Sequence, residues 1–253
     1  MVVVSIITRQ LEYCTQNINP YNRYWPFCIS HLFWSSTMKF SVSRLAAFCL
    51  SFALIATFAK AADKDGYTYL ANGKNMDGWK AFFDPKSTVD TSKNLTPKEY
   101  GFVSTGVPTG FFYTEKSFSN YVLEYEWRFP EGSKPESNSG CLVHMQEPFN
   151  KNFPKCLEPQ GRYLNHGKIF TIGMAKDEVE YNKFDQELLT KQLKPMGQWS
   201  KTEVTCTKDG VVKVKVNGVQ VSECKSKLTS GPIGFQSEGT EVHFRNIRLK
   251  QLP

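Results

Sequence analysis

The sequence has no long hydrophobic run, no internal repeat and no low-complexity tract. Its most apolar stretch, residues 45–58, is shorter than the ~20 residues that a membrane-spanning helix needs. Basic residues are not concentrated on any one predicted element, so the chain lacks the positively charged surface of a nucleic-acid-binding protein. We therefore expect no nucleic-acid partner, and no membrane association once the N-terminal signal described below is removed.

Acidic and basic residues nearly balance in most of the chain. The 253 residues include 31 Lys and Arg and 24 Asp and Glu, and residues 1–61 hold five of the basic and one of the acidic residues. The net charge of residues 62–253 is therefore +3, compared with +7 for the whole chain. This segment is long enough for one domain with a substantial hydrophobic core.

A secretory signal peptide is predicted at residues 38–61. It begins with a basic segment, continues with the apolar run 45–58 and ends with the small-x-small sequence Ala59-Lys60-Ala61. We expect cleavage after Ala61 and a secreted or periplasmic mature protein, residues 62–253. Residues 1–37 are interpreted as an upstream extension from a start codon assigned too early, because Met38 begins a complete signal; an unusually long n-region is the alternative.

The predicted mature protein has four cysteines, Cys141, Cys156, Cys206 and Cys224. An even number in an exported chain suggests disulfides, and four cysteines allow three connectivities. A bond between Cys141 and Cys156 would close the loop between two motif strands, and one between Cys206 and Cys224 would link the two sides of a hairpin. Buried free thiols are the alternative.

The pattern of apolar residues predicts an all-β fold. In residues 121–129, large apolar side chains alternate with Glu124, Glu126 and Arg128, which is typical of a half-buried strand. In the last third, Val-rich runs are joined by turns such as Asn217-Gly218. About a dozen short strands predict a sandwich of two antiparallel sheets, and the length favours a jelly roll. Helix is expected only within residues 177–194.

The segment from residue 138 to residue 161 is the predicted site of chemistry. Because alternate residues of a strand share a face, His144 is expected on the same face as Leu142, and Glu158 and Gln160 are expected to project together. A Glu, a Gln and a His side by side on a sheet can bind a sugar and move a proton. A solvated polar edge of the sheet is the alternative.

Short motifs spread over nearly all of residues 62–253 occur in a characteristic order: Leu70–Trp79, Glu126–Arg128, Asn138–Gly140, Glu158–Gln160, Gly197–Trp199, Val216–Gly218, Gly231–Gly239 and Phe244–Ile247. In this order the sequence resembles the 3-keto-disaccharide hydrolase family. The resemblance implies a concanavalin/LamG-like jelly roll with a sugar site on the concave sheet. One departure is Pro159, where the family usually has a β-branched residue; proline removes a hydrogen-bond donor from the strand, so the direction of Glu158 is left open.

The resemblance also implies a reaction. A 3-keto sugar has an acidic hydrogen at C2, so a base can remove it, the C1 oxygen can leave, and later addition of water gives net hydrolysis. This route does not need the paired carboxylates of ordinary glycosidases. Glu158 is predicted as the base, with a pKa raised by partial desolvation. Arg128 and Arg245 are candidates for binding the ketone or enolate oxygen, and His144 for the acid or a metal ligand.

Other residues are candidates for substrate binding, each with a structural alternative. Asn138 could contact substrate or only shape a turn, and Gln236, followed by Glu238, could line the groove or only complete a strand. Arg245 is as readily an ion-pair partner of Glu126 as a substrate ligand. Gln160 and Glu126 complete the predicted set.

The role of metals stays open in the sequence. His144 has the alternative of an ordinary core or surface histidine, and neither His166 nor His243 has a second ligand at metal-binding spacing. No cofactor is predicted with certainty, and a divalent metal is possible.

The sequence thus predicts a secreted enzyme that cleaves 3-keto-glycosides or 3-keto-disaccharides by hydrolysis or elimination, with a carbohydrate as its partner. A non-catalytic carbohydrate-binding module is the alternative, and it should expose aromatic residues such as Tyr163 or Phe112 on a groove. A structural or adhesion domain has no positive sign in the sequence. The oligomeric state is not indicated by these patterns.

Overall fold

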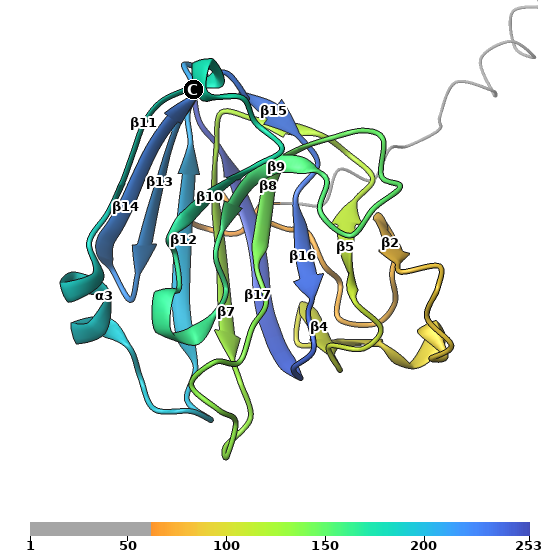
Figure 1. Ribbon diagram of the computed structural model, residues 1–253. Helices are drawn as coiled ribbons and strands as arrows, with labels where there is room; N and C mark the ends of the chain where they lie inside the picture. Colours follow the sequence, from red (N-terminus) through yellow and green to blue (C-terminus); the bar gives the residue numbers. More distant parts are fainter. Residues whose placement is uncertain (1–61) are drawn as a thin grey trace, which may run out of the picture. The chain divides into compact units, whose positions relative to one another are not determined.

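The computed structural model describes residues 62–253, which form two antiparallel β-sheets packed face to face (Figure 1). The larger sheet, sheet A, has this spatial order: β11 (Val179–Phe184), β14 (Val219–Ser226), β13 (Val211–Val216), β12 (Ser200–Cys206), β7 (Tyr121–Arg128), β17 (Val242–Gln251), β4 (Gly101–Ser104) and β3 (Leu95–Lys98), with β1 (Thr68–Tyr69) paired to β17. The predicted two-sheet sandwich with little helix is confirmed. The predicted extension 1–37 and signal peptide 38–61 lie outside the described residues.

The smaller sheet, sheet B, consists in spatial order of β10 (Ile169–Ile172), β9 (Lys155–Pro159), β8 (Cys141–Gln146), β16 (Gly234–Ser237), β5 (Gly110–Thr114) and β2 (Trp79–Phe83). Two short strands, β6 (Phe118–Ser119) and β15 (Ser230–Gly231), pair with each other. The remaining elements are the helix α3 (Gln186–Gln192) and the 3₁₀ turns η3 (Thr91–Lys93), η4 (Tyr163–Asn165) and η5 (Lys176–Glu178). No helix within residues 62–253 has the length and apolar character needed to cross a membrane.

The segment predicted as helical contains both a strand and a helix. Asp185 caps α3, because its carboxylate accepts a hydrogen bond of 2.9 Å from the Leu188 amide, and Leu189 is the buried contact of the helix. The preceding residues form β11, whose half-buried and exposed positions alternate as in an edge strand. The expectation of a helical turn or two within residues 177–194 is therefore confirmed, at residues 186–192.

The hydrophobic core lies between the two sheets and is rich in aromatic rings. From β7, Leu123, Tyr125 and Trp127 point inward, as the alternating sequence predicts. Phe235 of β16 meets Tyr125 edge to face, with ring centroids 5.0 Å apart, and this contact joins sheet B to sheet A. The polar residues between the inward ones therefore face away from sheet B.

Hairpin β13–β14 forms as the sequence predicts. Its two-residue loop places Asn217 and Gly218 at φ values of 48° and 90°, so the chain reverses in the turn type that matches the twist of paired strands.

The expected disulfides are absent from the described residues, where all four cysteines are buried free thiols. Cys206 and Cys224 are each paired with Val212, so one strand separates them. Two strand spacings amount to about 9–10 Å, which exceeds the reach of a disulfide. Cys141 packs in the core, whereas Cys156 belongs to a cluster on the other face of sheet B.

Two histidines are buried as neutral side chains. His166 stacks on Trp127 with ring centroids 3.9 Å apart, and its Nε2 lies 2.7 Å from the Thr202 hydroxyl. Burial lowers the pKa of His166 to about 3 and that of His144 to about 4. Both values lie below the ordinary 6.5, so the unfolded chain binds more protons than the folded protein in mildly acidic solution.

Stability should therefore fall as the pH drops below about 6.5. At pH 5 each histidine should cost about 2 kcal/mol of the free energy of unfolding. Urea unfolding at pH 7.5 and pH 5 checks this, with His166→Gln as the comparison. The variant starts less stable but should lose less stability between the two pH values; equal losses in both proteins would contradict the assignment.

Candidate active site

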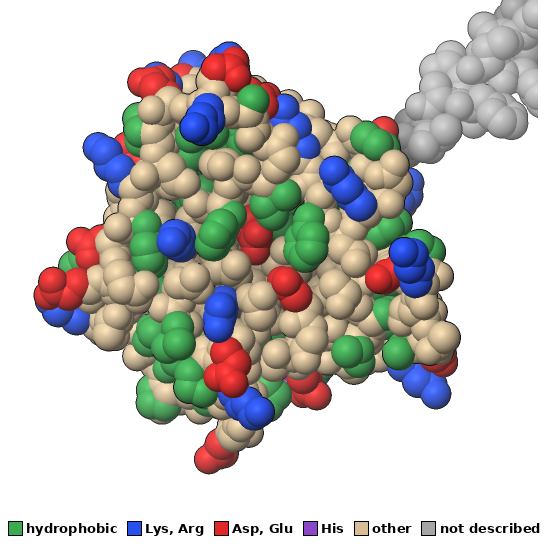
Figure 2. Space-filling view, in the orientation of Figure 1, with side chains coloured by type: hydrophobic (Ala, Val, Ile, Leu, Met, Phe, Trp, Pro, Cys, Tyr) green, Lys and Arg blue, Asp and Glu red, His purple; other side chains and the backbone are tan. Residues whose placement is uncertain are grey.

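Glu158 projects from the outer face of sheet B, the face that points away from sheet A. Along β9, Leu157 packs into the core between the sheets, so its neighbours Cys156 and Glu158 point the opposite way. Pro159 ends this strand and does not turn the carboxylate inward. Figure 2 looks onto this face and shows acidic side chains set among hydrophobic ones over β8, β9 and β16.

A glycine forms the floor beneath the carboxylate. Gly140 accepts a backbone hydrogen bond of 2.8 Å from Gln236, which places these residues side by side. A Cβ atom added to Gly140 would lie 2.2 Å from the Gln236 Oε1 atom and 2.5 Å from the Glu158 Oε1 atom. The two side chains therefore converge above Gly140, in space that any other residue would occupy.

Three acceptor oxygens around this glycine are buried without a hydrogen-bond partner within residues 62–253. They belong to Asn138, Glu158 and Gln236. Buried polar atoms are almost always hydrogen-bonded, so a group of unpaired acceptors is exceptional and fits a surface made to receive hydroxyl or C–H donors. Sequence reasoning named all three residues, and the structure brings Glu158 and Gln236 together above Gly140, with Asn138 two residues before that glycine.

The environment of Glu158 suits a general base. Glu158 is only 4% exposed, and its pKa is raised to about 8, mainly by burial and also by the Glu238 charge, although a hydrogen bond from the Gln236 amide lowers it. Burial also raises the pKa of Glu238. A carboxylate that ionises near neutral pH, with a second carboxyl group beside it, can both accept and return a proton.

Aromatic side chains flank the carboxylate. Phe170 of β10 is directly opposite Glu158 in the register, and it is 38% exposed. On the other side, Phe111 is opposite Gln236 and Phe82 is opposite Phe111, which gives an apolar floor. Sequence reasoning missed Phe170, although a strand over residues 168–172 pairing with β9 would have placed it beside the base.

Gln160 lies close to this group but has a partner of its own. It forms an isolated bridge with Gly140, and its Oε1 atom accepts a hydrogen bond of 2.8 Å from the Arg162 amide. Gln160 therefore shapes the chain beside the floor glycine.

His144 does not share the face of Glu158, so the predicted arrangement is wrong at this residue. Its φ of 54° lies in a bulge of β8, and the irregularity shifts the alternation by one residue. Met145 instead joins Leu142 on the outer face. The His144 ring lies 6.0 Å from the buried Tyr121 ring, and its Nδ1 atom is 3.0 Å from the Leu228 carbonyl oxygen.

The two predicted arginines lie on the opposite side of the sandwich. Arg128 and Arg245 project from the outer face of sheet A, where their guanidinium groups stack on Trp199 at 4.6 and 4.0 Å. Arg245 donates a hydrogen bond of 2.6 Å to Glu126, so the ion-pair interpretation of Arg245 is confirmed. Since packed sheets are about 10 Å apart, none of these residues shares a site with Glu158.

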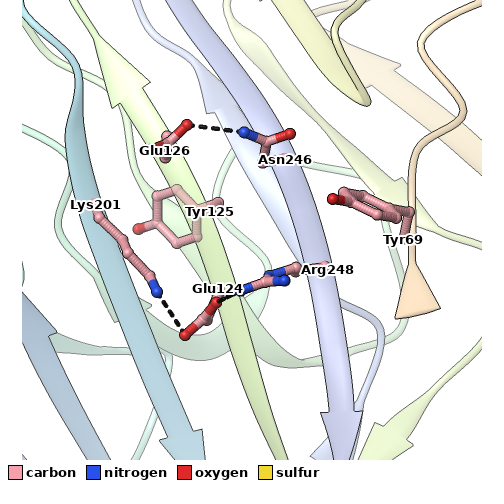
Figure 3. A pocket seen from close by; sticks show the side chains of 7 residues that line it. All are labelled: Tyr69, Glu124, Tyr125, Glu126, Lys201, Asn246 and Arg248. Carbon is pink, nitrogen blue, oxygen red and sulfur yellow. Dashed lines mark hydrogen bonds and ion pairs between the residues drawn. The ribbon is translucent and has the colours of Figure 1, made fainter. Parts of the chain in front are cut away.

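A polar pocket of about 220 Å³ on sheet A contains carboxylates that, unlike Glu158, are paired with neighbouring side chains (Figure 3). Here Glu124 binds Lys201 and Arg248, each at 2.7 Å, and Glu126 accepts a 2.9 Å hydrogen bond from Asn246. Although burial alone would raise the pKa of Glu124, its hydrogen bonds to Lys201 and Arg248 lower it. Both carboxylates are thus neutralised by neighbours, which is typical of a structural network.

The described residues hold no group of three or more His, Cys, Asp or Glu side chains arranged to bind a metal ion. Tyr163 and Phe112, the aromatics named as possible binding surfaces, serve the fold instead. Phe112 is fully buried in the core, and the Tyr163 hydroxyl donates a hydrogen bond to the Lys194 carbonyl.

Fold and site together define a two-sheet β-sandwich that carries a buried, unpaired carboxylate on the outer face of one sheet. The chain belongs to the 3-keto-alpha-glucoside-1,2-lyase-like domain family, whose model matches residues 66–250. The resemblance found in the sequence is confirmed. A protein named 3-keto-disaccharide hydrolase from Bacteroides thetaiotaomicron is 25% identical over 236 residues, covering 75% of this chain and 80% of that protein.

A solved structure shares the fold. A "putative glycosyl hydrolase" from Parabacteroides distasonis ATCC 8503 is 24% identical with a TM-score of 0.53, covering 75% of this chain and 95% of that one. A second, also described as a "putative glycosyl hydrolase" from that organism, is 19% identical with a TM-score of 0.49, covering 69% and 99%.

Replacing Glu158 by Gln should stabilise the protein in alkaline solution. The folded pKa of Glu158, about 8, exceeds the ordinary 4.5, so the unfolded chain releases this proton at a lower pH than the folded protein does. The free energy of unfolding therefore falls as the pH rises from 4.5 to 8. Glutamine stays neutral, and the gain at pH 8.5 should be on the order of a few kcal/mol.

Urea unfolding at pH 5, 7 and 8.5 measures this gain. Glu124→Gln is the matched control on sheet A, and it should destabilise the protein because it weakens the contacts with Lys201 and Arg248. A Glu158→Gln variant less stable than the parent protein at pH 8.5 would rule out the proposed environment.

Proposed function

We propose that this protein is a secreted or periplasmic enzyme that cleaves 3-keto-glycosides, with Glu158 as the base. One observation carries the proposal: Glu158 is buried beside Gln236 and above Gly140, its Oε1 atom has no hydrogen-bond partner, and it ionises near neutral pH. Membership of the family and the name of the Bacteroides relative support a 3-keto sugar as the substrate.

The reaction begins at C2 of the sugar, next to the C3 carbonyl. The Glu158 carboxylate takes the C2 proton, and the electron pair of the C–H bond forms the enolate. The charge then moves to the C3 oxygen, where the Nε2 amide group of Gln236, turned toward the sugar in place of Oε1, can donate a hydrogen bond in the role predicted for the arginines. Burial of the site strengthens this interaction, because water does not compete for the oxygen.

Elimination follows from the enolate. The C1–O bond breaks, a C1=C2 double bond forms, and the leaving oxygen takes a proton. Glu238 is the proposed donor in place of His144, because its own raised pKa keeps a larger share of it protonated. Addition of water to the double bond completes hydrolysis, whereas release of the unsaturated sugar would make the enzyme a lyase.

A carbohydrate-binding module is the second candidate, and one observation favours it. Phe170 is an exposed aromatic ring on the outer face of sheet B, as expected of a sugar-binding surface. Binding alone, however, does not require a buried carboxylate held without a partner at a cost in stability.

Kinetics of the purified protein test the enzyme proposal. With a 3-keto-glucoside as substrate, kcat/KM should rise with pH up to about 8, because only ionised Glu158 accepts a proton. Glu158→Gln should reduce the rate by about 10²–10⁴-fold. The unoxidised glucoside should not be turned over, and a parallel assay with a chelator measures any metal requirement.

Glu126→Gln on sheet A is the matched control and should leave turnover unchanged. If the parent protein bound the sugar but did not turn it over, the enzyme proposal would be ruled out and a carbohydrate-binding module would be supported. Full activity of Glu158→Gln would remove Glu158 from the role of base.

The export proposal predicts a mature protein that begins at Ala62. Intact mass and N-terminal sequencing of the protein recovered from the medium or periplasm measure this. Replacing Ala61 by a bulky residue such as Phe should block processing, since signal peptidases need a small residue there. A product that keeps residues 38–61 would contradict the prediction.

A further inference from the structure

The substrate of the proposed reaction is larger than the ring that loses its proton, so the site must also hold a leaving group. The unpaired Oε1 atom of Glu158 lies above Gly140, toward β8 and β16 rather than toward β10. Gln236 converges on the same place. The reacting ring therefore lies above Gly140, with Glu158 at its β10 side.

Burial shows in which direction the surface is open. Toward β5, Leu142, Met145 and Phe111 are fully buried in one apolar cluster, and Phe149 packs against that cluster. Toward β10, the side chain directly opposite Glu158 is Phe170, and it is exposed. The leaving group has room on the β10 side.

Phe170 is also held in place from one side. The Lys168 ammonium lies 5.5 Å from the centroid of the Phe170 ring and 5.8 Å from that of Phe184 on β11. Lys168 forms no salt bridge with a carboxylate within residues 62–253, and its ammonium lies over these two rings. Phe184 lies on β11, past the edge strand β10 as seen from Glu158. Lys168 therefore supports the Phe170 ring on the side away from the base.

We infer that Phe170 forms the leaving-group subsite, and that it binds leaving groups with a flat apolar face, such as the C–H face of a second pyranose. This inference rests on the proposed function. Aromatic rings contact flat partners over a large area without a hydrogen bond, so the subsite selects the shape of the leaving group and tolerates different hydroxyl patterns. Lys168 is a positioning residue, because it acts through the ring.

The test compares two substrates whose leaving groups are both alkoxides but differ in surface. One is a 3-keto-disaccharide with glucose as the leaving group, and the other is methyl 3-keto-glucoside. The full chain should show a higher kcat/KM for the disaccharide, and Phe170→Ala should lower that value by about tenfold, the size of one aromatic contact. Turnover of the methyl glycoside should fall by a smaller factor, so that the preference for the disaccharide is lost, and Phe170→Tyr should restore that preference.

Lys168→Met should weaken the same preference by a smaller factor, with the effect in KM rather than kcat. Lys183→Met is its matched control, because Lys183 lies 5.2 Å from the Tyr181 ring on β11 in the same kind of contact, away from the site. Thermal unfolding of each variant confirms that it is folded, and Phe170→Leu provides a second variant that keeps the apolar volume but not the flat ring.

Equal losses on both substrates in Phe170→Ala would overturn the inference, since the ring would then serve the fold or the reacting sugar. No preference for the disaccharide in the parent protein would overturn it as well. Failure of the proposed function gives a different result, in which the parent protein turns over neither substrate.

Discussion

The packing of two sheets against each other is the constraint on which the rest of this structure depends. Packed sheets lie about 10 Å apart, so every strand has one face in the core and one face outside. On β7 and β9 the inward residues Tyr125 and Leu157 belong to the same core. Their outward neighbours Glu126 and Glu158 end on opposite sides of the molecule, and the site is confined to one outer face.

The two outer faces treat carboxylates in different ways. Sheet A surrounds Glu124 and Glu126 with cations and an amide, which lowers the pKa of Glu124 despite its burial. Sheet B buries Glu158 without a partner and raises its pKa. A buried unpaired charge weakens the fold, so this carboxylate is retained at a cost that the sheet A network does not carry. Such a loss of stability is expected where the choice of residue is determined by reactivity rather than by stability.

Much of this arrangement follows from local pattern, and the exceptions have identifiable causes. Period-two alternation is sufficient to predict β7, and the Asn217-Gly218 turn is sufficient to predict the hairpin, whereas the direction of Glu158 beside Pro159 needed the structure. It fails at His144, where a bulge shifts the register by one residue; nothing in the surrounding side chains marks that bulge. It also cannot assign strands to sheets, because pairing depends on contacts between distant segments. Arg128 was therefore placed beside a base that lies on the other sheet.

The floor of the site is Gly140, which has no side chain beyond a hydrogen atom. Gly140 leaves room for two side chains to meet above the strand, and the Cβ of an alanine would fall on both of them. Gly140 directly precedes β8 and faces away from the core between the sheets. The depth of the site therefore depends on the absence of one side chain at residue 140, and it is set separately from the packing of the two sheets.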